Sequence, residues 1–422
     1  MSAAFPERWY VSYALLGATA AGLGPILLPL TVGAHATATD VGLVMGALNA
    51  GGLVGPLAGD LADRRGGQAL LFAGGCLMVA AGAAAFSYVD SSLAYMGLAL
   101  LQGAGTAMAA TVANLLVVER HAREEWDGRL ASLQASYGAG QVAGLVGAGV
   151  IGAASLVAGL RVAALLAGAG GVSALLLVRS VPGPVGARPV AAHASRVPGA
   201  SAVAAQGHSH RMMLQGLRRL RDAEDSSFGR FLIAWFVTFG SVAAIFSLYP
   251  VLMARVFGVS PAVSSVVFGA AAAVGLGLYA PAGRWSEKAG ASRVLRAGLW
   301  TRVVAAAALW LLAAVHPHGG AWLALLSFCA IVLAWSLLSV SATIITAQLA
   351  RIGEGPAMGL FNAATALAAV AGSVVGGVVA GRYGYAGVPA VATLGIVIGL
   401  AMTIGFERRE RTTELRNAGG SS

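Results

Sequence analysis

Long apolar runs alternate with short polar segments along almost the whole chain. A helix needs about 20 apolar residues to cross the hydrocarbon core of a bilayer, which is about 30 Å thick. Strands of membrane barrels are only about 10 residues long and alternate apolar with polar positions, so these runs indicate helices. The pattern predicts an all-α membrane protein with 12 transmembrane helices, at 10–33, 40–59, 69–88, 92–117, 134–157, 160–178, 230–254, 260–282, 292–314, 320–349, 357–380 and 385–406.

The composition changes this picture little and excludes several classes of protein. Hydrophobic residues make up 58% of the 422 positions and charged residues only 10%, whereas soluble globular chains carry about 25% charged residues. A water-soluble enzyme, a disordered chain and a coiled coil are therefore excluded. The two cysteines, Cys76 and Cys329, both lie in apolar runs, so no disulfide framework is indicated.

The net charge of +10 is distributed unevenly between the two sides of the predicted membrane protein. Of the 27 Arg and Lys residues, only Arg161, Arg255 and Arg382 lie on the side opposite the termini, and Arg302 lies within a span. Basic residues accumulate on the cytoplasmic side of membrane proteins. We therefore expect a multi-pass protein of the plasma (inner) membrane with both termini in the cytoplasm, and no nucleic-acid partner.

One long polar segment divides the spans into six plus six. Residues 179–229 are rich in Pro, Gly, Ser, His and Arg. Within this segment, Met213, Leu217 and Leu220 follow a helical spacing beside three arginines, which is typical of a short amphipathic helix on the inner membrane surface. A solvated linker with chance periodicity is the alternative. The predicted division is an N-terminal six-helix bundle (1–178), this cytoplasmic linker (179–229), a C-terminal six-helix bundle (230–406) and a cytoplasmic tail (407–422).

Two motifs occur once in each half, at similar distances along the chain. Residues 59–66 read GDLADRRG, and residues 283–290 read GRWSEKAG, with glycine, acid, base and glycine at the same spacing. The triplet Val-Ala-Gly at 142–144 returns at 370–372. Two independent matches of this kind predict that a six-helix unit has been duplicated.

With these motifs and the central linker, the chain resembles the major facilitator superfamily over nearly its whole length. The family's loop between spans 2 and 3 carries a glycine, an acid four residues later, a base and a second glycine. Gly67 and Gln68 depart from that motif, because the family usually has two basic residues there. Pro25 and Pro29 in the first span resemble the drug-efflux branch, though far less specifically. The matching residues are Gly59, Asp63, Arg64 and Gly66, with Gly283, Glu287, Lys288 and Gly290 as a degenerate second copy.

The resemblance implies that this loop is a conformational latch. Asp63 would hold the two halves together in the outward-open state. Glu119, at the inner end of the fourth span, is a candidate partner for Arg64 or Arg65, because arginine pairs with carboxylates across helix interfaces. The alternative is that these residues are solvated loop charges that follow only the positive-inside rule.

The resemblance also implies a substrate site between the halves, lined by spans 1, 4, 7 and 10 with help from 2, 5, 8 and 11. Arg302, in span 9, is the ionisable residue deepest within a span, and such residues are functional candidates. It either binds substrate or extends toward the inner membrane surface. The remaining candidates form an uncharged, partly aromatic set, although each could instead bond a neighbouring helix: Asn49, Gln102, Asn114, Tyr137, Gln141, Trp235, Tyr249, Ser336 and Asn362.

The predicted function is secondary active transport of a small organic compound by alternating access, most simply as export. No Asp or Glu lies well inside a predicted span, which disfavours exchange of lipophilic cations for protons and favours a neutral or anionic substrate. The alternatives are a permease for such a metabolite and a transporter-like binding protein without flux. We expect a monomer in contact with membrane lipid, protons as the candidate coupling ion, and no catalytic residue, cofactor or metal.

Overall fold

The computed structural model describes residues 7–65, 67–178, 227–315, 319–349 and 354–419, and the regular elements in these ranges are all helices. The apolar runs form the helices because they satisfy every backbone hydrogen bond internally, as a membrane interior requires. The first half consists of α1 (Tyr10–Gly17), η1 (Ala18–Leu23), α2 (Gly24–His35), α3 (Ala38–Gly51), η2 (Gly52–Val54), α4 (Gly55–Arg65), α5 (Gln68–Ala85), η3 (Phe86–Tyr88), α6 (Ser92–Arg120), η4 (Arg123–Glu125), α7 (Trp126–Ala154) and α8 (Leu156–Leu177).

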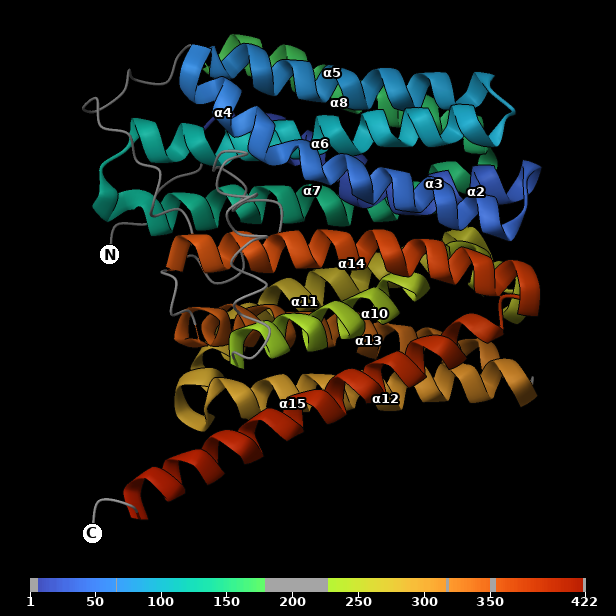
Figure 1. Cartoon of the computed structure of the whole chain (residues 1–422). Helices are drawn as coiled ribbons and strands as arrows, with labels where there is room; N and C mark the ends of the chain where they lie inside the picture. Colours follow the sequence, from blue (N-terminus) through green and yellow to red (C-terminus); the bar gives the residue numbers. More distant parts are fainter. Residues whose placement is uncertain (1–6, 66, 179–226, 316–318, 350–353, 420–422) are drawn as a thin grey trace.

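The second half repeats the arrangement with six long helices. They are α10 (Ser227–Phe257), α11 (Pro261–Ala289), α12 (Ala291–Val315), α13 (Gly320–Leu349), α14 (Glu354–Tyr383) and α15 (Gly387–Gly419). In Figure 1 the first half, in blue to green, lies above the second half, in yellow-green to red.

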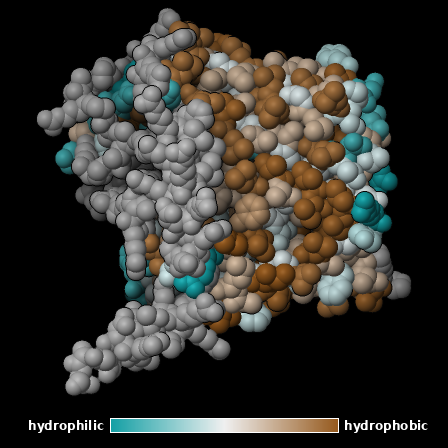
Figure 2. All heavy atoms as spheres, in the orientation of Figure 1, coloured by the Kyte–Doolittle hydropathy of each residue, from teal (hydrophilic) through white to brown (hydrophobic). Residues whose placement is uncertain are grey.

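Eleven helices within the described ranges are long and apolar enough to span a membrane, and the protein is a multi-pass membrane protein. The remaining long helix, α7, carries polar residues such as Gln134 and Gln141 among its glycines. Large apolar side chains are exposed, for example Leu93 (79%) and Leu165 (72%). Figure 2 shows apolar side chains over the middle of one face and hydrophilic ones gathered at its right edge. Exposure of this kind suits contact with lipid.

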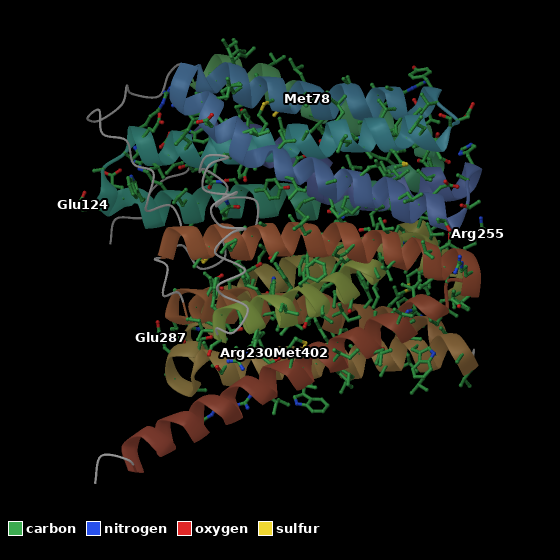
Figure 3. All side chains as sticks on the ribbon, viewed as in Figure 1. Met78, Glu124, Arg230, Arg255, Glu287 and Met402 are labelled. Carbon is green, nitrogen blue, oxygen red and sulfur yellow. The ribbon has the colours of Figure 1, made fainter. Side chains whose placement is uncertain are left out.

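The first helix begins and the last helix ends at the same end of the bundle, on the left in Figure 1. We call this the inner end and the opposite one the outer end. Figure 3 places Glu124 and Glu287 at the inner end and Arg255 at the outer end. An even number of crossings, as the sequence predicts, produces this arrangement.

The halves contact each other through α3 with α14 and through α7 with α11. The approach is tightest near the outer end, where a Cβ added to Gly377 would lie 2.6 Å from the Cα of Gly42. The Thr39 hydroxyl donates a hydrogen bond to the Gly377 carbonyl (3.4 Å), and the Arg255 guanidinium donates to the Gly33 carbonyl (3.4 Å). Backbone contact of this kind requires residues without a side chain.

Three glycines of these helices toward the inner end have no close neighbour that the structure describes. A Cβ added to Gly128 of α7, Gly283 of α11 or Gly359 of α14 would meet no heavy atom within 4 Å in the described part of the chain. Among the described residues, the halves therefore meet in close backbone contact at the outer end, and these three glycines toward the inner end make no such contact.

Several helices extend beyond the predicted spans at the inner end. Helix α7 begins at Trp126 rather than near 134, and α4 continues the second span through Gly59 to Arg65. The predicted amphipathic helix between Arg211 and Glu224 lies outside the described residues, so it stays a prediction.

Candidate functional site

Five aromatic side chains form one cluster in the second half. Phe231, Trp235 and Phe239 of α10 lie one helical turn apart, and they meet Trp335 of α13 and Phe361 of α14. The ring centroids of Trp235 and Phe361 are 5.0 Å apart, and those of Phe239 and Trp335 are 5.5 Å apart. Rings at these distances attract one another beyond the burial of their area. We call these five residues the aromatic cluster.

Trp235, a predicted site residue, occupies the centre of the aromatic cluster. Its side chain is 4% exposed, and its indole Nε1 donates a hydrogen bond of 2.8 Å to the Thr365 hydroxyl. Thr365 in turn donates to the carbonyl of Phe361. This indole is therefore fixed in position and presents mainly its rings to its surroundings.

Arg302 of α12 points into the second half rather than toward the membrane surface. Its side chain is 1% exposed, so the expectation that it extends to the inner surface is wrong. The guanidinium carbon lies 5.7 Å from the centre of the Trp335 ring, which places a cation over an aromatic face. Nε has no hydrogen-bond partner among the described residues. The helix turns this side chain inward because Gly298, one turn earlier, packs against Leu338 of α13.

Tyr279 of α11 lies at the other edge of Trp335. Its hydroxyl is within hydrogen-bonding reach of the Trp335 indole and the Ser339 hydroxyl. An indole N–H can only donate, so a hydrogen bond between these two groups would leave the proton of the Tyr279 hydroxyl available. Tyr279, Ser339 and Trp335 are all partly exposed.

A cluster of polar side chains lies inside the first half. The Gln134 amide donates to the Asn114 side-chain oxygen (3.2 Å), and Asn114 donates to the carbonyl of Ala110 (2.8 Å). The Tyr13 hydroxyl lies next to both amides, and its ring is 4.8 Å from that of Tyr137. The predicted residues Asn114 and Tyr137 thus lie in one cluster on α1, α6 and α7.

Asn49 forms a direct bond between the halves. Its amide donates a hydrogen bond of 3.1 Å to the Ser373 hydroxyl of α14. The Ser373 hydroxyl is also hydrogen-bonded to the Ser247 hydroxyl of α10, at 2.5 Å. Ser373 is fully buried. The structure therefore places Asn49 in the contact between the halves.

The other predicted residues are bonded or packed separately. The Tyr249 hydroxyl donates a hydrogen bond of 2.8 Å to the Ser264 carbonyl, and its ring stacks on Phe328. The Ser336 hydroxyl donates a hydrogen bond of 2.7 Å to the Gly275 carbonyl. These two hold helices together. Gln102 and Asn362 are buried with amide nitrogens that have no partner among the described residues, while the partly exposed Gln141 packs its backbone against Gly22.

The predicted latch is described only in part. Gly59 is buried within α4, and the side chains of Asp63 and Arg64 and the whole of Gly66 lie outside the described residues. Glu119 accepts a hydrogen bond from the Gln68 amide. Gln68 stands where the family usually has a base, so a neutral donor joins α5 to the Glu119 carboxylate on α6.

A glycine with positive φ lies at the end of each motif copy. Gly67 has φ 72° and begins α5, and Gly290 has φ 90° directly after α11. These positive values favour glycine. Gly283, Glu287 and Lys288 belong to α11 itself.

A charged cluster fixes the start of the chain to the inner end of α7. The Glu7 carboxylate lies 2.8 Å from Nε2 of His121 and forms a salt bridge with Arg129. Nε of Arg129 also donates a hydrogen bond of 2.6 Å to the Glu125 carboxylate. Burial lowers the pKa of His121, while the Glu7 carboxylate opposes that shift. The hydrogen bond from Arg129 lowers the pKa of the Glu125 carboxyl.

Sequence reasoning missed Tyr279, Trp335 and Ser373. Trp335 was adjacent to a predicted residue, and the spacing of four between Phe231, Trp235 and Phe239 was a visible signal of one aromatic helix face. In the described ranges no three His, Cys, Asp or Glu side chains come together as a metal site would require.

Solved structures with similar folds are transporters. The chain is 13% identical to the nucleoside transporter NupG (TM-score 0.70), with 95% of this chain and 99% of that one covered. It is 15% identical to a bacterial homologue of the human lysosomal transporter Spinster in an inward-facing, unoccupied conformation (TM-score 0.70, 95% of each chain). A D-xylose–proton symporter is 14% identical (TM-score 0.68, 93% and 95%). At these identities the likeness shows the fold.

The sequence comparisons identify the family. No curated protein sequence matches the chain. The sequence profile of the Major Facilitator Superfamily, however, matches residues 9–351 and again 231–422. The second match begins at the start of the second half, as expected for a duplicated unit. The chain belongs to the Major Facilitator Superfamily.

Proposed function

We propose that the protein is a secondary transporter that moves a small organic compound by alternating access between its two halves. The observation that carries the proposal is the asymmetry of their interface. Gly42 and Gly377 meet at the outer end, whereas a Cβ added to Gly128, Gly283 or Gly359 at the inner end would meet no described heavy atom within 4 Å. Rocking the halves about the middle of the membrane would reverse this asymmetry.

Export from the cytoplasm across the plasma membrane is the direction that we propose, with both termini in the cytoplasm. The predominance of arginine in the sequence segments predicted to face the cytoplasm supports this orientation. In the conformation described here, substrate would then enter from the cytoplasm. Protons are the candidate coupling ion, as in the symporter whose fold is similar.

A permease for a neutral or anionic metabolite is the second candidate. The buried Arg302 favours an anionic substrate, because a cation with no carboxylate partner among the described side chains attracts negative charge inside a membrane protein. Vesicle flux separates both transporters from a binding protein that carries out no flux.

Cross-linking tests alternating access. Asn49→Cys together with Ser373→Cys joins α3 to α14 where the native side chains are 3.1 Å apart. Oxidation of this pair should abolish flux of any compound that stabilises the protein thermally, and a reductant should restore it. Each single cysteine variant, with Cys76→Ala and Cys329→Ala in the background, is the control. Unchanged flux through the cross-linked protein would contradict the proposal.

The latch gives a separate prediction. Asp63→Asn should slow transport while leaving substrate affinity within a few-fold, because a latch residue changes the balance between conformations and does not touch substrate. Flux and thermal-shift titrations on the same preparation measure the two quantities. Asp90→Asn, in an exposed loop at the outer end, is the matched control. Loss of binding with normal cycling would exclude the latch role.

A further inference from the structure

We propose that Arg302, Trp335 and Tyr279 form a subsite for the anionic group of the substrate, and that the aromatic cluster beside it receives an apolar or aromatic body. The inference rests on the proposed function for its physiological role, while the site itself is defined by its contacts. The ligand class is an organic anion such as an aromatic carboxylate or sulfonate.

The first argument is the energy of the buried cation. An arginine near the middle of a membrane helix is energetically costly unless it is compensated. Contact with Trp335 covers one face of the guanidinium, but a ring face does not accept hydrogen bonds from the N–H groups at its edge as a carboxylate would. Nε has no hydrogen-bond partner in the described part of the chain. The arginine is therefore incompletely satisfied.

The second argument is the placement of negative side chains. Among the side chains that the structure describes, no carboxylate forms a salt bridge with Arg302. A buried arginine that stabilises a fold alone is normally paired with an acid. Here the second half supplies the cation, and an anionic ligand would supply its partner.

The third argument is the set of donors around Trp335. Arg302 lies over its ring face, and the Tyr279 hydroxyl, which can donate a hydrogen bond, lies beside its indole edge. Donors without a carboxylate select negative charge over positive or neutral groups. The partly exposed Trp335, Tyr279 and Ser339 provide the approach to the buried guanidinium.

The fourth argument is the neighbouring apolar surface. The ring centroid of Trp335 lies 6.3 Å from that of Trp235 and 5.5 Å from that of Phe239. Trp335 therefore belongs to both the subsite and the aromatic cluster. An aromatic body attached to the anionic group would stack there. The two parts together select an amphipathic anion.

Thermal unfolding of the full-length protein in detergent tests the subsite without requiring flux. The probes are benzoate and benzenesulfonate, each compared with its uncharged amide, benzamide or benzenesulfonamide, at constant ionic strength. We expect the acids to bind at least about tenfold more tightly than the amides, as a charge-assisted hydrogen bond provides. Arg302→Gln should remove this preference, and Arg302→Lys should retain part of it.

Two further variants keep the test decisive. Arg161→Gln removes an exposed arginine at the outer end and should leave the preference unchanged. If Arg302→Gln does not fold, Tyr279→Phe provides the test, because it removes one hydrogen-bond donor and keeps the ring. This variant should weaken the affinity for benzoate several-fold and leave the affinity for benzamide unchanged. Equal affinity of the acids and amides for the native protein would overturn the subsite, and so would a preference that survives Arg302→Gln.

The outcomes also separate this inference from the proposed transport. Selective binding of benzoate without vesicle flux would support the subsite and contradict transport. Flux of neutral compounds without preference for acids would support transport and overturn the subsite.

Discussion

Replacing Gly377 by leucine is expected to stop transport while leaving the protein folded. A Cβ at this position would lie 2.6 Å from the Cα and 2.9 Å from the backbone nitrogen of Gly42, and 3.0 Å from the Thr39 carbonyl. These three atoms belong to the other half and to backbone, which cannot move aside as a side chain can. Leucine therefore prevents α3 and α14 from closing at the outer end, without overpacking the second half itself.

Distances between spin labels or fluorophores at the outer ends of α3 and α14 should increase in Gly377→Leu. Thermal unfolding should stay close to that of the native protein, and vesicle flux should fall to background. Gly359→Leu, on the same helix but with no heavy atom within 4 Å of its added Cβ, is the matched control. Normal flux through Gly377→Leu would show that outer closure is not part of the transport cycle.

Both the spans and the duplication were predictable from sequence, because they depend on local properties. Twenty apolar residues form a membrane helix almost wherever they occur. The Val-Ala-Gly triplet marked α7 and α14, and both helices pack through glycine against the first helix of their own half: Gly144 against Ala18, and Gly372 against Gly240. The repeated sequence thus corresponds to a repeated helix crossing.

The site was predictable only in part, because the direction of a side chain depends on tertiary packing. Arg302 was found from its charge, but its contact with Trp335 follows from how α12 packs on α13. Tyr249 and Ser336 are polar residues on the expected spans, yet each bonds a backbone carbonyl. Polarity in a membrane helix identifies a residue that needs a partner, and the partner is either substrate or another helix.

The fold itself should fail when Gly372, five residues before Gly377 on α14, is replaced by leucine. A Cβ on Gly372 would overlap the Gly240 carbonyl of α10, which belongs to the same half. Overpacking of a close helix contact costs about 1–3 kcal/mol or more, and separation of α10 from α14 would also disturb the hydrogen bond from Trp235 to Thr365. We therefore expect a lower unfolding temperature and poor yield in detergent for Gly372→Leu, and the same for Gly144→Leu in the first half. Gly359→Leu again provides the control, and an unfolding temperature equal to that of the native protein would contradict the prediction.

Gly372 and Gly377 lie on one helix and receive the same substitution. If Gly372→Leu unfolds the protein and Gly377→Leu only stops flux, one face of α14 serves stability and the other serves conformational change.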